Sequence, residues 1–174
     1  EGFSISKAIL QTEITNYSLI PANLDLAAAE GELIGEIGWD RALRDALGQV
    51  QSTYDFVLID CPPSIGMLTV NALVASDYTL MPLQAEFLPL KGVRSFLKHF
   101  ELIKKLNSKI NLLGFVLTKF DTRKKMNQSV LNVLKEEFGE DKVFNSKIRS
   151  NIALATAQEN GLDIFSFKKN SNGA

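Results

Sequence analysis

The sequence lacks several features that mark particular classes of protein. Cys61 is its only cysteine, so no intrachain disulfide can form, and no histidine–cysteine cluster suggests zinc. No apolar run reaches the roughly 18 residues that a membrane-spanning helix needs, and we expect no membrane partner. The net charge of −1 favours neither nucleic acid nor an anionic lipid surface as a bulk partner. Any such contact must come from a local patch.

A phosphate-binding loop is the most informative absence. The pattern G-x-x-x-x-G-K-[ST] occurs nowhere, and the sequence has no Gly-Lys pair at all. Without that loop there is no cradle of backbone amides and no lysine for the β- and γ-phosphates of a nucleotide. We therefore expect residues 1–174 to be cut from a longer protein, to bind ATP weakly by themselves and to be inactive alone.

Short β-rich runs alternate with longer helical stretches. Hydrophobic residues make up 45% of the chain and charged residues 22%, which is typical of a globular domain, and we expect one domain over residues 1–174. The patterns predict strands at 17–20, 56–59, 78–81, 112–117 and 143–144. They predict helices at 24–37, after an Asp40 N-cap, at 67–74, 92–106, 128–138 and from an Asn151 cap to Gly161. This alternation indicates an α/β fold with a doubly wound, mainly parallel sheet flanked by helices.

Ligands of such sheets bind beyond the carboxyl ends of the strands. The residues that follow each predicted strand are therefore the candidates for a site. They are Pro21-Ala22-Asn23, Asp60-Cys61-Pro62-Pro63, Pro82-Leu83-Gln84 and Thr118-Lys119-Phe120-Asp121. We expect all four segments to lie on one rim.

Asp60 carries the strongest signal because it ends an apolar run, where an ionised carboxylate needs a partner. A Walker B aspartate has this position and holds Mg²⁺, directly or through water. Pro62 and Pro63 then fix a rigid, extended turn. The alternative is an aspartate that only caps the turn toward the next helix.

Two further segments have a functional and a plain interpretation. In Thr118-Lys119-Phe120-Asp121, the carboxylate could accept hydrogen bonds from a nucleotide base and the lysine stem could lie along its ring; the alternative is a solvated turn. Six basic residues could form a patch that tracks phosphates if they meet in space. They are Arg123, Lys124, Lys125, Lys142, Lys147 and Arg149. The alternative for the run at 123–125 is a solvated helix start.

The stretch Asp60-Cys61-Pro62-Pro63-Ser64-Ile65-Gly66 resembles the Walker B segment of ParA/Soj partition ATPases, a deviant-Walker class that also contains MinD. The resemblance extends over nearly the whole chain. It includes residues 19–27 before Walker B, residues 82–87 with Gly92 after the next strand, and Leu117 to Arg123. It continues from Phe138 to Phe144 and from Ile148 to Gly161.

The resemblance implies a function that composition does not. Members of the family bind ATP and Mg²⁺, form homodimers around two nucleotides, bind DNA nonspecifically, and hydrolyse ATP when a ParB-like centromere-binding protein stimulates them. It implies a cytoplasmic, nucleoid-associated protein. By resemblance Asp60 serves Mg²⁺ and the attacking water. The nucleotide would be bordered by Pro62, Pro63, Thr118, Lys119, Asp121, Ser150 and Asn151, and the six basic residues would face DNA.

The chain departs from the family's pattern in three ways. It starts after the P-loop, the signature lysine and the first switch aspartate. The family's Ile-Pro-Arg-Asn reads Ile148-Arg149-Ser150-Asn151, and a family arginine is replaced by Ala153. These changes leave two alternatives open. One is a MinD-like or cargo-positioning ATPase, and the other is a non-enzymatic remnant that keeps a partner-binding surface.

Overall fold

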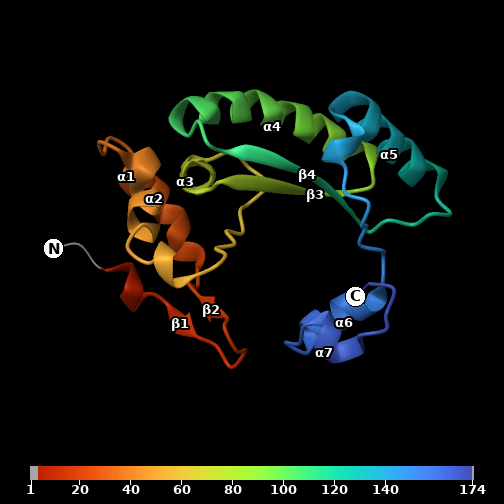
Figure 1. The fold of residues 1–174 in the computed structure, drawn as a ribbon, viewed down its shortest axis with the longest axis horizontal. Helices are drawn as coiled ribbons and strands as arrows, with labels where there is room; N and C mark the ends of the chain where they lie inside the picture. Colours follow the sequence, from red (N-terminus) through yellow and green to blue (C-terminus); the bar gives the residue numbers. More distant parts are fainter. Residues whose placement is uncertain (1–3, 174) are drawn as a thin grey trace. The chain divides into compact units, whose positions relative to one another are not determined.

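The computed structural model describes residues 4–173, with the side chains of residues 87–91 left aside. The chain forms two compact units (Figure 1). The first contains residues up to Asp77 together with His99–Ile110, and the second contains Tyr78–Lys98 together with the chain from Asn111 onward. One long helix, α4 (Phe87–Leu106), contributes to both. The expectation of a single domain stays a prediction.

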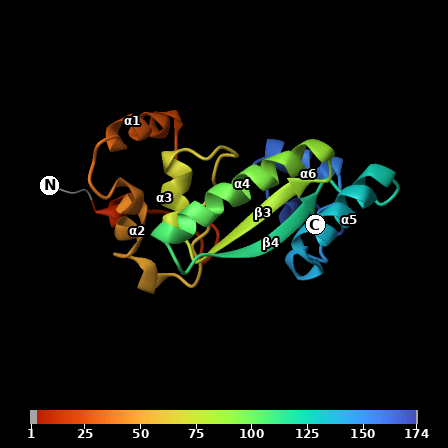
Figure 2. The same cartoon turned by 90° about the horizontal axis from the view of Figure 1, so that it is seen from above.

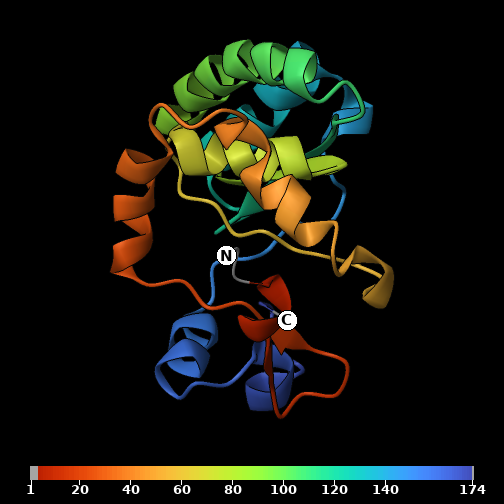
Figure 3. The same cartoon turned by 90° about the vertical axis from the view of Figure 1, so that its left-hand side faces the viewer.

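The first unit is mostly helical (Figure 3). It begins with the 3-10 turn η1 (Ile5–Lys7) and a small antiparallel pair formed by β1 (Leu10–Gln11) and β2 (Ser18–Leu19). The helical elements that follow are η2 (Leu24–Ala28), α1 (Ala29–Leu33), η3 (Trp39–Arg41), α2 (Ala42–Leu47), η4 (Gln51–Thr53) and α3 (Met67–Ala75).

Side-chain amides and carboxylates hold these helices together. The Asn71 Oδ1 accepts a hydrogen bond from the Leu43 N–H at 3.1 Å, which ties the start of α2 to α3. The Asn107 Nδ2 donates to the carbonyls of Leu73, Val74 and Ser76 at the end of α3. These bonds add partners for backbone groups at the helix ends, where intrahelical hydrogen bonds run out.

Three predictions for the first unit are wrong in detail. The predicted strand at 17–20 is only the two-residue β2, and it pairs antiparallel with β1 rather than joining a parallel sheet. The predicted helix at 24–37 is the short sequence η2 and α1, which ends at Leu33 because Ile34 is extended and Gly35 has a φ of 89°. Asp40 lies inside η3, and its side chain caps no helix.

The predicted apolar strand at 56–59 is not formed. These residues have no regular secondary structure, and Phe56 and Leu58 are 87% and 91% exposed. An apolar run becomes a buried strand only where neighbouring strands satisfy its backbone groups. Among the described residues, 4–173, no strand pairs with this segment. The first two of the four candidate segments belong to the first unit, so the prediction that all four share one rim stays a prediction.

The second unit contains the parallel α/β arrangement. The strands β3 (Tyr78–Gln84) and β4 (Asn111–Thr118) pair in parallel, with Leu83 opposite Leu117. A bulge at Leu113 shifts the register, since Thr79 pairs with Leu112 while Leu80 pairs with Gly114. The helices α4 and α5 (Lys125–Phe138) lie on the same face of the strand pair (Figure 1, Figure 2). The parallel α/β class is thus confirmed.

One face of the β3–β4 pair packs into the core of this unit. Phe115, Leu117 and Leu134 are fully buried there, and the ring centroids of Phe115 and Phe138 lie 5.1 Å apart. The remaining buried members of this cluster are Leu83, Ala85, Val93, Phe120, Val130 and Val143. The strand predictions at 78–81 and 112–117 and the helix prediction at 128–138 are confirmed, because their apolar residues meet in this core.

The end of the chain continues along β4. Gly139, at a φ of 95°, ends α5 as predicted, and η5 (Glu140–Lys142) follows. Residues 143–144 contribute one parallel bridge, Phe115 to Val143, rather than a strand. A Cβ on Gly114 would lie 2.5 Å from the Lys142 carbonyl oxygen, so this close approach requires glycine. The chain ends with α6 (Ile152–Glu159), capped by Asn151 as predicted, and α7 (Ile164–Lys168).

Candidate functional site

The carboxyl ends of β3 and β4 lie side by side because the two strands are parallel and in register. Gln84 is opposite Thr118, and the Ala85 N–H donates to the Thr118 carbonyl at 3.3 Å. Two of the four predicted segments, 82–84 and 118–121, therefore do share one rim. Backbone and side-chain groups that converge here form the usual ligand-binding edge of a parallel sheet.

A third segment joins this rim from later in the chain. The Phe120 N–H donates to the Ile148 carbonyl at 3.1 Å, and the Ser150 N–H donates to the Phe120 carbonyl at 3.4 Å. These bonds form a parallel bridge between Phe120 and Arg149. They bring the predicted residues Thr118, Lys119 and Asp121 next to Ser150, and Asn151 follows as the cap of α6. Five of the seven predicted nucleotide-binding residues thus lie along two adjoining backbone segments.

Lys119 has the left-handed backbone conformation, with a φ of 50°. This conformation costs a residue other than glycine about 1–2 kcal/mol. The exposed lysine sits at the turn between β4 and the buried Phe120. Strained residues of this kind gather at ligand-binding sites, which makes Lys119 a stronger candidate than its sequence alone does.

Asp121 is held in one position by its neighbour Arg123. The Arg123 Nε and Nη2 donate to the two carboxylate oxygens at 3.0 and 2.9 Å, and the Arg123 N–H donates to Oδ1 at 3.0 Å. These hydrogen bonds lower the pKa of Asp121 to about 2. The side chain is therefore an acceptor only, and any base that it contacts must present a donor.

We expect Arg123→Gln to raise the pKa of Asp121 from about 2 toward the ordinary value of about 3.9. A carboxyl pKa that is lowered by folding stabilises the native state above the unfolded pKa, and this stabilisation is lost as the pH falls from about 4 toward 2. Carboxyl ¹³C titration by NMR measures the shift directly. Lys125→Gln is the matched control, because Lys125 is an exposed cation that has no part in lowering the pKa of Asp121. An unchanged midpoint in Arg123→Gln would contradict the assignment.

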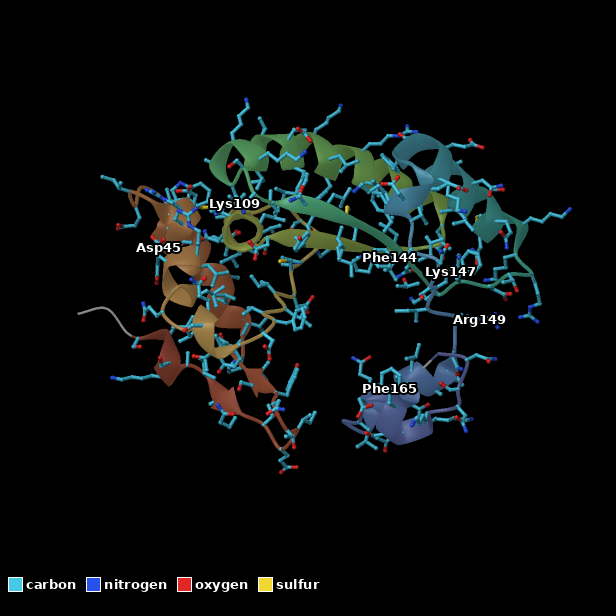
Figure 4. All side chains as sticks on the ribbon, viewed as in Figure 1. Asp45, Lys109, Phe144, Lys147, Arg149 and Phe165 are labelled. Atoms are coloured by element: carbon cyan, nitrogen blue, oxygen red, sulfur yellow. The ribbon has the colours of Figure 1, made fainter. Side chains whose placement is uncertain are left out.

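The six predicted DNA-binding residues do not form one patch. Arg123, Lys124 and Lys125 are exposed at the start of α5, and Arg149 lies at the bridge to Phe120. Lys147 is on the same connecting segment (Figure 4), with its Nζ 5.7 Å from the centroid of the Phe120 ring. Five of the six therefore lie near the carboxyl end of β4.

Lys142 lies at the opposite end of the strand. Its Nζ donates to the Leu112 carbonyl at 3.3 Å, near the start of β4. Six residues of strand, about 20 Å, separate Leu112 from Thr118. Lys142 is therefore remote from the other five basic residues within this unit.

Asp60, Pro62 and Pro63 belong to the first unit and are exposed in an irregular segment. The capping alternative for Asp60 is not what the structure has, because the Glu30 Oε1 accepts the hydrogen bond from the Leu68 N–H in the first turn of α3. Within residues 4–173, no hydrogen bond to the Asp60 carboxylate is seen. A shared site for Asp60 and the turn at 118–121 stays a prediction.

Sequence reasoning missed Asn127, which is 3% exposed on α5. Its Oδ1 accepts from the Asp121 N–H at 2.7 Å, and its Nδ2 donates to the Ala85 carbonyl at 2.6 Å. The available signal was a polar amide three residues before Val130, on the face of the helix that carries the apolar residues. Its backbone partners lie far away in the sequence, so no local pattern identifies them.

A pocket of about 360 Å³ lies in the first unit, where α3 and α4 end. Its lining includes Arg44, Asp77, Asn107 and Lys109, and none of the predicted site residues. Over the described part of the chain, no group of three or more potential metal ligands is present, and no helix has the length and apolarity required to span a bilayer.

The chain resembles known proteins along most of its length. A family profile described as "AAA domain" matches residues 1–112. The chain is 39% identical over 171 residues to the chromosome-partitioning ATPase Soj of Treponema pallidum, which covers 98% of this chain and 67% of that protein. It is 38% identical over 167 residues to the sporulation initiation inhibitor protein Soj of Bacillus subtilis, covering 95% and 66%. The chain thus spans about two thirds of the length of these relatives.

The fold is also found among solved structures. Cobyrinic acid a,c-diamide synthase from Mycobacterium smegmatis, with a bound ATP analog and magnesium, superposes with a TM-score of 0.79 at 35% identity. That match covers 86% of this chain and 59% of the other. The parallel β3–β4 pair with its helices is consistent with the P-loop ATPase fold of such proteins. Sequence identity across nearly the whole chain and this shared fold lead to one conclusion: the chain belongs to the ParA/Soj family of partition ATPases.

Proposed function

We propose that the protein containing this chain is a ParA-type ATPase that segregates plasmids or chromosomes. It binds ATP and Mg²⁺, forms a homodimer in the ATP state and binds DNA nonspecifically. A ParB-like partner stimulates its hydrolysis of ATP. The protein acts in the cytoplasm, in association with the nucleoid. Residues 1–174 supply the base side of the nucleotide site and part of the DNA-binding surface, and alone they are inactive.

The observation that carries this proposal is the parallel bridge between Phe120 and Arg149. It joins the two segments that the family resemblance assigns to the nucleotide base, Thr118 to Asp121 and Arg149 to Asn151. Asp121 offers an ionised acceptor for the amino group of a base. The stem of Lys119, at a strained and exposed turn, can cover the ring. Asn151 is already engaged as a helix cap, so its role is to orient the segment.

Asp60 suits a magnesium ion by its chemistry. Mg²⁺ is usually bound through one or two carboxylates, waters and the phosphates of the substrate. The Asp60 carboxylate is exposed and, among the described residues, holds no hydrogen-bond donor, so it is available as such a ligand. The bound ion would neutralise charge on the phosphates. Pro62 and Pro63 restrict the backbone that follows, which limits how far the carboxylate can move.

The start of α5 supports a contact with phosphate groups. Its first turn contains no acidic residue, and Lys124 and Lys125 stand where the helix dipole disfavours cations. A DNA phosphate near Arg123, Lys124 and Lys125 would be attracted by these charges and by the helix end alike. We therefore place the DNA surface at the carboxyl end of β4, with Lys147 and Arg149, and assign Lys142 a smaller part.

The experiment uses the protein expressed from the complete reading frame that contains this chain. We expect Asp60→Ala to lower ATP hydrolysis by about 100-fold or more, because a stabiliser of transition-state charge is lost. The matched control is Asp55→Ala, which removes an exposed carboxylate from the same segment. The measurement is the rate of phosphate release from ATP, with and without DNA and the ParB-like partner. Equal activity in Asp60→Ala and the unsubstituted protein would overturn the assignment.

Retention on DNA separates this function from the alternatives. A partition ATPase is retained on nonspecific DNA with ATP and released with ADP, and retention falls as salt rises. The triple variant Arg123→Gln, Lys124→Gln, Lys125→Gln should abolish retention, while Lys142→Gln should weaken it less. Binding to anionic liposomes without binding to DNA would favour a MinD-like protein. Binding to a partner without ATP turnover would favour a non-enzymatic remnant.

A further inference from the structure

Asn127 joins the two turns that follow β3 and β4. Its side chain is buried, and both of its polar atoms bond to backbone groups: Oδ1 to the Asp121 N–H at 2.7 Å and Nδ2 to the Ala85 carbonyl at 2.6 Å. The backbone N–H of Asn127 donates to the Lys124 carbonyl at 3.0 Å. Both polar atoms of the Asn127 side chain therefore have a hydrogen-bond partner.

Only an amide side chain of this length can make both bonds. The Asp121 N–H is a donor and must meet the amide oxygen, whereas the Ala85 carbonyl is an acceptor and must meet the amide nitrogen. The orientation of the amide is thus determined by its two partners. An aspartate would keep the acceptor and lose the donor, and an alanine would lose both.

The backbone at Ala85 and at Asp121 is also held by hydrogen bonds from other segments. Ala85 is 1% exposed, and its N–H donates to the Thr118 carbonyl at 3.3 Å. Ala85 is therefore held from β4 on one side and from α5 on the other. Asp121 follows Phe120, which is bound to the segment at 148–150. The Asn127 side chain thus closes a ring of hydrogen bonds through both turns.

We propose that Asn127 is a positioning residue, which holds the turn at 84–86 and the turn at 118–121 in one geometry for the base of the nucleotide. This inference rests on the proposed function for the identity of the ligand. Asn127 does not itself contact the base. It fixes the Asp121 backbone, and with it the direction of the Asp121 carboxylate, and it links a bound base to the turn that leads into α4.

Amide hydrogen exchange on this chain tests the link without any nucleotide. In Asn127→Asp the Ala85 carbonyl loses its donor and the turn at 84–86 loosens, so we expect the Ala85 N–H, which donates to Thr118, to exchange at least about 10-fold faster. The Asp121 N–H keeps its acceptor and should stay protected. In Asn127→Ala we expect both amides to exchange faster. Gln128→Ala, a neighbouring exposed residue, is the control and should change neither. A uniform increase that includes the Phe115 and Leu117 amides, or no change in either variant, would overturn the link.

The role of Asn127 in recognition of the base is tested by ligand binding to the protein expressed from the complete reading frame. We expect Asn127→Asp to weaken ATP binding by about 10-fold and to leave the binding of inorganic tripolyphosphate unchanged, since only ATP carries the base. Equal weakening of both ligands, or of neither, would overturn the role in positioning. If the unsubstituted protein binds tripolyphosphate but gains nothing from the base, the proposed base site is wrong. The exchange measurement would still decide whether Asn127 links the turns.

Discussion

Phe115→Ala is expected to lower the free energy of unfolding by about 3–5 kcal/mol, because it removes a fully buried ring from the core of the second unit. The Phe115 ring lies between β4 and α5, with its centroid 5.1 Å from that of Phe138. Leu117 and Leu134, which are also fully buried, leave little room for the core to close the resulting cavity. The loss is therefore close to the full cost of truncating an aromatic residue.

The matched control for this change is Leu113→Ala on the same strand. Leu113 is 46% exposed at the bulge of β4, so its truncation should cost about 1 kcal/mol or less. Urea denaturation followed by circular dichroism measures both variants. Similar losses for the two would show that the face of β4 assigned to the core is wrong.

Asn107→Asp is expected to destabilise the first unit by about 3 kcal/mol at neutral pH, since it removes the donor to the Val74 and Ser76 carbonyls and adds a negative charge beside them. The Asn107 Nδ2 now donates to Leu73, Val74 and Ser76, at 3.1, 3.2 and 2.7 Å. Its Oδ1 also accepts from the Lys109 N–H at 3.2 Å. One amide thus connects the end of α3 to the residues that follow α4.

The cost of Asn107→Asp should depend on pH. A new carboxyl beside carbonyl oxygens has a raised pKa in the folded state, because its neutral form can donate a hydrogen bond and its ionised form cannot. The variant is then closest to the unsubstituted protein near pH 4, and its deficit grows as the pH rises through the raised pKa. Thermal unfolding at pH 4 and pH 7 measures this trend, with Ser108→Ala, an exposed neighbour, as the control. A deficit independent of pH would contradict the explanation.

Local patterns were sufficient for the second unit. The apolar residues of 112–117 and 128–138 predicted β4 and α5, and Gly139 predicted the end of that helix. These elements form because each carries one buried face and meets a partner within the chain. The same reasoning failed at 56–59, where the apolar residues are present and no strand pairs with them among the described residues. Hydrophobicity indicates that a segment can be buried, but pairing requires a neighbour.

The candidate site, too, was only partly predictable from the sequence. Thr118, Lys119 and Asp121 were predicted because they follow a strand, and that position was visible in the sequence. Their approach to Ser150 depends on backbone bonds between segments about 30 residues apart, which no local pattern encodes. The six basic residues appeared equivalent in the sequence, yet Lys142 lies at the other end of β4.

By itself the sequence determined the class of this protein and its family, because the spacing of apolar residues and the motif at 60–66 depend only on the order of the residues. Tertiary structure alone decided which polar groups are engaged. The Asp121 carboxylate is bound by Arg123, Glu30 rather than Asp60 caps α3, and Asn127 joins two turns. Hydrogen bonds between distant segments depend on distance and direction in space, and these exist only after the chain has packed.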